Sequence, residues 1–324
     1  MGQDRTVILT EPRGFCAGVR RAIAIVERAL ELYGPPVYVR KEIVHNQHVI
    51  RDLERRGARF VDSEEAVPPG AVCVLSAHGV APDVRRNGDR LGLRLIDATC
   101  PLVAKVHQEA RRVTRDGRTL LLIGHASHEE VEGTYGEAPD RTIVVENVDD
   151  ARGLELPPDT PVAYLTQTTL SLDETADVVA ELRGHFTDLV GPPSDDICYA
   201  SQNRQNAVKA VAARSDLVLV VGSGNSSNSV RMVEVAQAAG TPAHLLPDAG
   251  ELDERWLAGV RTVGVSSGAS APEVLVYDLL ARLADLGFTE IEIEHTATED
   301  VVFSLPPMRS RPAEENPPIE KGHS

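Results

Sequence analysis

Short apolar runs alternate with helical patterns along most of the chain. These runs are rich in valine, isoleucine and leucine, which predicts buried strands. Strands that alternate with helices favour parallel sheets covered by helices on both faces, so the pattern predicts an α/β fold. The runs cover residues 7–10, 37–44, 71–77, 93–98, 119–124, 142–148, 161–166, 216–222 and 262–267.

Three of the predicted helices begin directly after a cysteine. Cys16, Cys100 and Cys198 each precede a segment with apolar positions at helical spacing. The second segment carries Pro101 at its first position and Gly117 at its end, which is the usual placement of these residues in a helix. The cysteines are therefore expected to occupy equivalent positions in the fold.

Polar residues recur at similar distances after the three cysteines. A first strand ends in a polar cluster at a nearly constant offset from each cysteine, at His45, His128 and Ser226. A second strand ends in polar residues further along, at a more variable offset, at His78, Thr168 and Ser270. Each cysteine is thus followed by two polar strand ends in the same order.

This repetition predicts three similar α/β domains with small, mostly parallel sheets, arranged as a pseudo-threefold trefoil around a central cavity. The expected boundaries are 1–98, 99–195 and 196–305, followed by a proline-rich, charged tail over 306–324 that is expected to be disordered. Ligands of parallel sheets bind beyond the carboxyl ends of the strands, so the cysteines and the polar strand ends are expected to meet there. Three unrelated helices that each begin with cysteine are the alternative.

Composition narrows the possible partners. Acidic residues outnumber basic ones by 49 to 33, and this charge repels a nucleic-acid backbone. No apolar run approaches the roughly 18 residues of a membrane span, and the charged N-terminus does not read as a secretory signal. Four scattered cysteines then indicate a cytoplasmic protein whose thiols are metal ligands, catalytic groups or core residues.

Three converging thiolates suit a [4Fe–4S] cluster in which one iron lacks a protein ligand. Helix N-termini favour the negative charge of such a cluster, and an open iron can hold a substrate oxygen while electrons are delivered. Air is expected to convert a cluster of this kind to the [3Fe–4S] form. The fourth cysteine, Cys73, lies in the middle of a predicted strand and is expected to be a core residue.

The polar clusters suggest an anionic ligand and a proton donor. Residues 225–228 read Asn-Ser-Ser-Asn between a strand and a helix, the kind of helix start that binds phosphate. Imidazoles at the other strand ends are suited to grip phosphate oxygens. Glu130 is the candidate proton donor because burial beside anionic groups raises the pKa of a carboxyl group, and Thr168 is placed to orient a substrate hydroxyl.

Taken together, these motifs resemble the LytB family of diphosphate reductases. The matching stretches are PRGFCAGV (12–19), HNQHV (45–49), SAHGV (76–80), DATCPLV (97–103), GHASHEEVEG (124–133), TQTTLS (166–171), ICYASQNRQ (197–205), VGSGNSSNS (221–229) and GASAPE (268–273). The resemblance implies the reductive removal of a hydroxyl group from 4-hydroxy-3-methylbut-2-enyl diphosphate, which ends the non-mevalonate route to isopentenyl and dimethylallyl diphosphate. It also implies the trefoil fold.

The resemblance assigns roles to individual residues. Glu130, Thr168 and His128 would serve catalysis, and a separate reduced ferredoxin or flavodoxin would supply electrons. Ser201 and Ser266-Ser267 depart from the threonine and threonine-alanine usual in the family but keep a small or hydroxylated side chain. The implied cluster ligands are Cys16, Cys100 and Cys198. The implied substrate-binding residues are His45, His78, His128, Thr168, Ser226, Ser227, Asn228 and Ser270; all but Thr168 are implied to lie at the diphosphate.

Two other functions fit parts of the pattern. A zinc hydrolase could use His45, His78 and His128 as ligands with Glu130 as base, but the three cysteines would then have no role. A cluster sensor or a diphosphate-binding module would use the same ligands without needing Glu130 as a proton donor.

Overall fold

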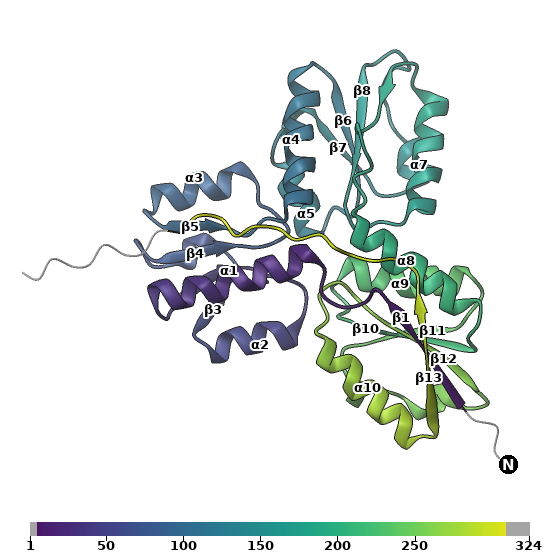
Figure 1. Ribbon diagram of the computed structural model, residues 1–324. Helices are drawn as coiled ribbons and strands as arrows, with labels where there is room; N and C mark the ends of the chain where they lie inside the picture. Colours follow the sequence, from purple (N-terminus) through teal and green to yellow (C-terminus); the bar gives the residue numbers. More distant parts are fainter. Residues whose placement is uncertain (1–4, 309–324) are drawn as a thin grey trace, which may run out of the picture.

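The computed structural model describes residues 5–308, which fold into three α/β units, each built on its own parallel sheet (Figure 1). Helices cover both faces of each sheet; in the second unit, for example, α4 (Pro101–Arg115) and α7 (Leu172–His185) lie on opposite sides. The predicted trefoil of three similar α/β domains is confirmed. Within residues 5–308, no helix is long and apolar enough to cross a membrane.

The first two units share one strand order. The first sheet runs β3-β2-β4-β5, with bounds Ala58–Val61, Val37–Arg40, Val72–Leu75 and Arg94–Asp97. Its helices are α1 (Ala17–Tyr33), α2 (Gln47–Arg55) and α3 (Pro82–Arg90). The second sheet runs β7-β6-β8-β9, with bounds Thr142–Val145, Thr119–Ile123, Val162–Thr166 and Leu189–Val190. Besides α4 and α7, the second unit contains α5 (Glu129–Tyr135) and α6 (Val148–Arg152).

The third unit repeats this order and adds one strand. Its sheet runs β11-β10-β12-β1-β13, with bounds Ala243–Leu246, Leu217–Val221, Thr262–Ser267, Arg5–Glu11 and Phe288–His295. Its helices are α8 (Tyr199–Ala212), α9 (Ser227–Ala238) and α10 (Glu273–Asp285). The fourth strand of every sheet leads into the next cysteine: β5 precedes Cys100, β9 precedes Cys198 and β1 precedes Cys16.

The place of β1 corrects the predicted boundary of the first unit. Residues 5–11 belong to the third sheet, where β1 pairs in parallel with β12, Val7 opposite Val263, and with β13. The apolar run at 7–10 was correctly predicted to be a strand, but hydrophobicity does not tell which sheet a strand joins. Strand β1 therefore belongs to the third unit, although it precedes the first unit in the sequence.

Four strands and one boundary were not predicted. Strands β3, β9 and β11 are short or flanked by polar residues, and β13 alternates glutamate with isoleucine at the edge of its sheet. Strand β2 ends at Arg40, not at residue 44, because Lys41 adopts a left-handed backbone with φ 53°. The predicted disordered tail lies outside the described residues apart from 306–308, and Met308 packs against the core of the first unit.

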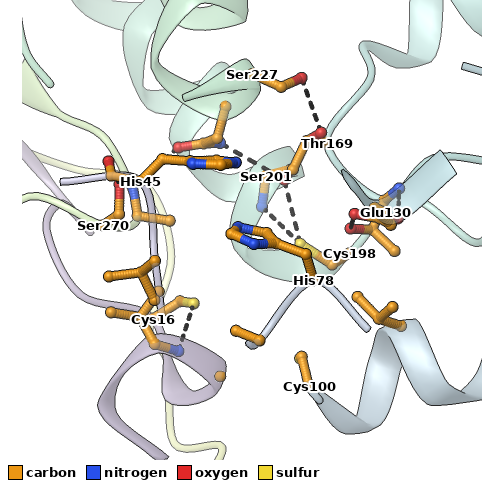
Figure 2. Close-up of a pocket in the computed structure, with 18 of the residues that line it drawn as sticks. Cys16, His45, His78, Cys100, Glu130, Thr169, Cys198, Ser201, Ser227 and Ser270 are labelled. Atoms are coloured by element: carbon orange, nitrogen blue, oxygen red, sulfur yellow. Dashed lines mark hydrogen bonds between the residues drawn. The ribbon is translucent and has the colours of Figure 1, made fainter. Parts of the chain in front are cut away.

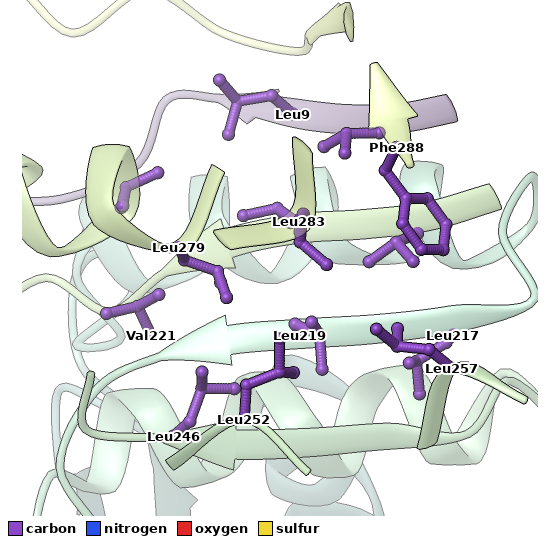
Figure 3. Close-up of a cluster of buried hydrophobic side chains, with 14 of the residues drawn as sticks. Leu9, Leu217, Leu219, Val221, Leu246, Leu252, Leu257, Leu279, Leu283 and Phe288 are labelled. Atoms are coloured by element: carbon purple, nitrogen blue, oxygen red, sulfur yellow. The ribbon is translucent and has the colours of Figure 1, made fainter. Parts of the chain in front are cut away.

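Apolar side chains bury β1 on both faces of the third sheet. Val7 and Leu9 pack with Leu279 and Leu283 of α10 in one cluster, shown in Figure 3. Ile8 faces the opposite cluster, under α8 and α9. Strand β1 is therefore buried on both faces of the third sheet and stabilises it as an interior strand does.

The pairing of β1 can be tested by hydrogen exchange. Leu279→Ala removes a fully buried side chain and should destabilise the third unit by about 2–5 kcal/mol. The amides of residues 5–11 should then exchange faster together with those of 262–267, while those of β2 and β4 keep their rates. Leu121→Ala, a matched change in the core of the second unit, should leave residues 5–11 unaffected. Exchange of 5–11 in step with β2 would contradict the pairing.

Candidate functional site

Each of the three cysteines is the N-cap of a helix, as the sequence predicted. Cys16 caps α1 and its sulfur accepts from the backbone N–H of Val19 at 3.5 Å. Cys198 caps α8 and accepts from the N–H of Ser201 at 3.3 Å. Cys100 occupies the same position before α4, and Pro101 follows it as the first helical residue. All three thiols thus lie where the helix dipole favours negative charge.

Backbone hydrogen bonds tie each cysteine to the unit before it. In every case the cysteine N–H donates to a carbonyl at the second polar strand end of that unit. The three bonds are Cys100 to Ala77 at 3.0 Å, Cys198 to Thr168 at 3.0 Å and Cys16 to Ala269 at 3.2 Å. The repeated offsets in the sequence therefore correspond to a repeated contact, in which each cysteine joins the strand end that carries His78, Thr168 or Ser270.

One cavity is lined by all the residues that the sequence predicted to bind a cluster or a substrate or to serve catalysis. Figure 2 shows members of this set from all three units around the cavity, among them the three cysteines, His45 and His78. The residues are Cys16, His45, His78, Cys100, His128, Glu130, Thr168, Cys198, Ser226, Ser227, Asn228 and Ser270. Cys73 lies apart, fully buried in β4, which confirms that it is a core residue.

The three histidines of the cavity contact one another. The rings of His45 and His78 stack with centroids 4.1 Å apart, and the ring of His128 meets them edge-on at 5.5 and 5.8 Å. Burial and the neighbouring imidazoles lower the pKa of His78 and bring that of His128 to about 3. A bound anion would oppose both effects, so this arrangement is suited to a ligand that brings its own negative charge.

Two glutamates contact two of the histidines. Glu42 Oε2 lies 2.9 Å from Nδ1 of His45 and also accepts from Asn225 of the third unit at 2.9 Å. Glu129 Oε2 lies 3.3 Å from Nδ1 of His78. The Glu42 carboxylate on Nδ1 orients the ring of His45 and leaves its Nε2 available to a ligand, while Glu129 places a negative charge beside His78.

Glu130 is buried, with 3% of its surface exposed, and both of its oxygens contact Thr168. The backbone N–H of Thr168 donates to Oε1 at 2.6 Å and the hydroxyl donates to Oε2 at 2.9 Å. Burial raises the pKa of Glu130 to about 7, although the bonds from Thr168 favour the ionised form. The group therefore exchanges a proton near neutral pH, as a general acid must.

The third unit presents hydroxyls, an amide and a helix N-terminus to the cavity. Ser226 caps α9, and the free N–H groups of the first turn add to its capacity to bind an anion. Asn228 accepts from the N–H of Ala269 at 2.8 Å, which fixes its side chain. Ser270 donates to the carbonyl of His45 at 2.9 Å, which joins the third unit to the first at the cavity wall.

Two of the three thiols bind their protons tightly because they are buried. Burial raises the pKa of Cys100 to about 12 and that of Cys198 to about 11, and a cationic centre would reverse this shift. Within residues 5–308, no three His, Cys, Asp or Glu side chains are arranged to hold one metal ion. Thiolates are the usual ligands of iron–sulfur clusters, so the cysteines of the cavity fit a group of that kind.

Gly18 allows the thiols of the first and second units to approach. A Cβ atom at this position would lie 2.8 Å from Cys100 Sγ and 3.8 Å from Cys16 Sγ. Any side chain here would therefore displace the Cys100 thiol. The glycine two residues after Cys16 is a requirement of the site and not of the helix, whose backbone conformation other residues can adopt.

Some residues of the site were not assigned a role from the sequence. Ser201 Oγ lies 3.2 Å from Cys198 Sγ, and its position one turn after a capping cysteine was the available signal. Thr169 donates to Ser227 at 2.9 Å and joins the second unit to the third. Glu42 could not be identified, because its contact with Asn225 depends on how the units meet.

Comparison with known proteins agrees with this geometry. A family model described as LytB protein matches residues 7–284. The 4-hydroxy-3-methylbut-2-enyl diphosphate reductase of Acidothermus cellulolyticus is 58% identical over 308 residues, 95% of this chain and 91% of that protein. The protein of the same name from Tropheryma whipplei is 57% identical over 303 residues, 93% and 97% of the two chains.

Solved structures extend the similarity to the fold. The E-1-hydroxy-2-methyl-but-2-enyl-4-diphosphate reductase of Plasmodium falciparum superposes with a TM-score of 0.91 at 40% identity, covering 94% of this chain and 96% of that one. An (E)-4-hydroxy-3-methyl-but-2-enyl diphosphate reductase, described as the terminal enzyme of the non-mevalonate pathway, gives 0.62 at 30% identity, covering 87% and 99%.

The raised pKa of Glu130 predicts a measurable dependence of stability on pH. The pKa of Glu130 is 4.5 in the unfolded chain and about 7 in the folded protein, so the folded protein binds this proton more tightly. The proton's contribution to the free energy of unfolding is therefore fully present below pH 4.5 and is lost as the pH rises through 7. Glu130→Gln stays neutral and should therefore be more stable than the wild type at pH 8, by up to about 3 kcal/mol, and equal to it below pH 4.5.

Chemical denaturation of the metal-free protein at pH 4.5 and pH 8 measures this difference. Glu132→Gln, on the same helix but exposed, is the matched control and should show no such pH dependence. Equal stabilities of wild type and Glu130→Gln at both pH values would contradict the raised pKa.

Proposed function

Because the chain belongs to the LytB family, we propose that it reduces 4-hydroxy-3-methylbut-2-enyl diphosphate to isopentenyl and dimethylallyl diphosphate. Two electrons and two protons enter the reaction, the allylic C–O bond breaks, and the hydroxyl group leaves as water. The enzyme is an oxidoreductase of the non-mevalonate isoprenoid pathway. The observation that carries the proposal is the convergence of three thiols, three imidazoles, a buried acid and a helix N-terminus on one cavity.

We assign Cys16, Cys100 and Cys198 as ligands of one [4Fe–4S] cluster. The support is their common position at helix N-caps, their convergence from three units and the space that Gly18 leaves beside Cys100. When bound, the cluster supplies electrons and a Lewis-acidic iron without a protein ligand for the substrate hydroxyl. Because three cysteines are proposed to bind a cluster of four irons, one iron is left without a cysteine ligand.

The diphosphate is proposed to bind between the histidines of the first two units and the polar strand ends of the third. Burial keeps His78 and His128 neutral in the free protein, so an arriving diphosphate can accept hydrogen bonds from their N–H groups, with His45 stacked alongside. Hydroxyl and amide groups with the N-terminus of α9 complete the anion site, as expected for Ser226, Ser227, Asn228 and Ser270. Because the donors come from all three units, binding also holds the units together.

Glu130 is proposed to hold the proton that leaves with the hydroxyl group. Its pKa of about 7 keeps a substantial protonated fraction near neutral pH, and Thr168 fixes its orientation through two bonds. The Thr168 hydroxyl can turn between Glu130 and a substrate oxygen, which would pass the proton over one hydrogen bond. His128, the N-cap of the same helix, links this acid to the diphosphate site.

Electron supply and location follow from the chemistry. The reaction needs two electrons from outside, and we propose a reduced ferredoxin or flavodoxin as the donor. The four cysteines are all unpaired, which supports a reducing compartment such as the cytoplasm.

The central test is an anaerobic assay with a reduced viologen and the hydroxylated diphosphate. Wild-type protein should be brown, contain about four irons per chain and form both products. Glu130→Gln should keep the cluster spectrum and substrate binding but lose at least about a hundredfold in turnover, whereas Glu132→Gln stays active. Full activity of Glu130→Gln would remove Glu130 as the proton donor. Substrate binding without turnover in the wild type would favour a binding module, and colourless protein with stoichiometric zinc would overturn the cluster.

The close approach at Gly18 gives a separate test of the ligand set. Gly18→Ala should turn the Cys100 thiol away and lower iron retention in anaerobically purified protein, with little effect on folding. Gly184→Ala is the matched control, since the added methyl group at this exposed position of α7 meets nothing within 4 Å. Iron content by colorimetric analysis and Tm by calorimetry separate the two effects. Normal iron content in Gly18→Ala would remove Cys100 from the proposed ligands.

A further inference from the structure

Each cysteine-capped helix carries a cation in the second turn after its cysteine. Arg21, Lys105 and Arg204 occupy these positions on α1, α4 and α8. Arg21, in the first unit, donates through Nη1 to the carbonyl oxygens of Ala98 at 3.2 Å and Thr99 at 3.0 Å. These carbonyls belong to the segment that enters Cys100, and not to the segment of Arg21's own cysteine.

The same contact recurs on the second helix. Lys105, on α4, donates to the carbonyl oxygens of Ser194 at 2.9 Å and Asp195 at 3.2 Å. Its ammonium group also lies 3.3 Å from the buried carboxylate of Asp196. These residues form the segment that enters Cys198, so the helix of the second cysteine holds the approach to the third.

The third helix makes the same kind of contact with the first unit's cysteine segment. Arg204, on α8, is completely buried and donates to the carbonyl oxygen of Gly14 through Nη2 at 2.6 Å and Nε at 3.2 Å. Gly14 lies in the segment that enters Cys16. In all three cases the accepting carbonyls lie just before the helix-capping cysteine of another unit.

Residues 296–308, here named the C-terminal strap, contact two of the three cations. The strap runs from β13 across α1 toward the first unit (Figure 1). Glu299 pairs with Arg204 at 2.9 Å, and the carbonyl of Ser304 accepts from Arg21 at 2.9 Å. These cations are thus held in place by groups other than the carbonyls before the cysteines.

We propose that Arg21, Lys105 and Arg204 form a ring of positioning residues, the cation ring, that fixes the three thiols relative to one another. Each cation lies on the helix of one cysteine and holds the backbone just before the cysteine of another unit. The three contacts together connect the three units in a ring. The inference rests on the proposed function only in that the three thiols bind one cluster. The contacts of the cations are made by the protein itself and do not depend on the cluster. A carbonyl held by a charged donor is more strongly fixed than one held by a neutral donor.

A directional prediction separates this role from general stabilisation. Removing a cation should release the cysteine that follows in the ring more than the cysteine of its own helix. In metal-free protein, Arg21→Met should raise the alkylation rate of Cys100, and Lys105→Met that of Cys198, by roughly tenfold or more. Mass spectrometry after iodoacetamide labelling reads each cysteine separately, with buried Cys73 as the internal reference.

Matched controls lie on the same helices. Arg28→Met on α1 and Arg112→Met on α4 remove exposed cations that pair with a glutamate on the same helix, and should leave all rates unchanged. Lys105→Arg should restore the wild-type rate at Cys198. A change of Arg204 alone would leave the half-buried carboxylate of Glu299 without its ion-pair partner. The third link is therefore tested with the double variant Arg204→Gln/Glu299→Gln, which should raise the alkylation rate of Cys16.

The reconstituted protein supplies an independent readout. Loss of cluster iron to a chelator should be faster in Arg21→Met and Lys105→Met than in their controls, with an altered electron paramagnetic resonance signal. Equal acceleration at all three cysteines, or acceleration only at the cysteine of the altered helix, would overturn the ring. Failure of the protein to take up iron would count against the proposed function, while the alkylation pattern of the metal-free protein would still test the ring.

Discussion

Each of the three helix-capping cysteines belongs to two units at once, and the site depends on this constraint. Its side chain lies at the start of a helix of one unit, while its backbone N–H donates to a strand end of the unit before. A thiol is thereby placed between a helix N-terminus and a polar strand end of the neighbouring unit. Because the bond repeats three times around the molecule, the three thiols face one cavity although they are far apart along the chain. No single unit contributes all three.

The electrostatics of the cavity are arranged for a ligand with negative charge. His78 and His128 are held neutral by burial, the acid Glu130 is held near its protonated form, and the thiol of Cys100 binds its proton tightly. A diphosphate would stabilise positive charge on the two imidazoles, and a cationic centre would stabilise the Cys100 thiolate, whereas an anionic ligand keeps Glu130 protonated. Assembly of the site and binding of its ligands should consequently be coupled to proton movements, with protons leaving the thiols and the imidazoles gaining hydrogen bonds to phosphate.

The sequence predicted most of the residues that line the cavity, for a definite physical reason. Helix caps and strand ends leave local signals, and the offsets after Cys16, Cys100 and Cys198 repeat those signals three times. Contacts between units leave no such signal. The pairing of β1 with β12, the bond from Asn225 to Glu42 and the cation ring depend on how distant segments meet, and hydrophobic periodicity carries no information on that. The roles proposed for the individual side chains remain predictions.

The place of β1 in the third sheet also constrains how the protein is made. Strand β1 is synthesised long before its partners β12 and β13, which begin at Thr262 and Phe288. The first two sheets contain only local connections and can form before the third, whereas the third sheet must wait for nearly the whole chain. The N–H of Cys16 reaches the carbonyl of Ala269 only in that last step. The three thiols therefore converge only when folding is complete, so a partly made chain does not present the full set to a metal.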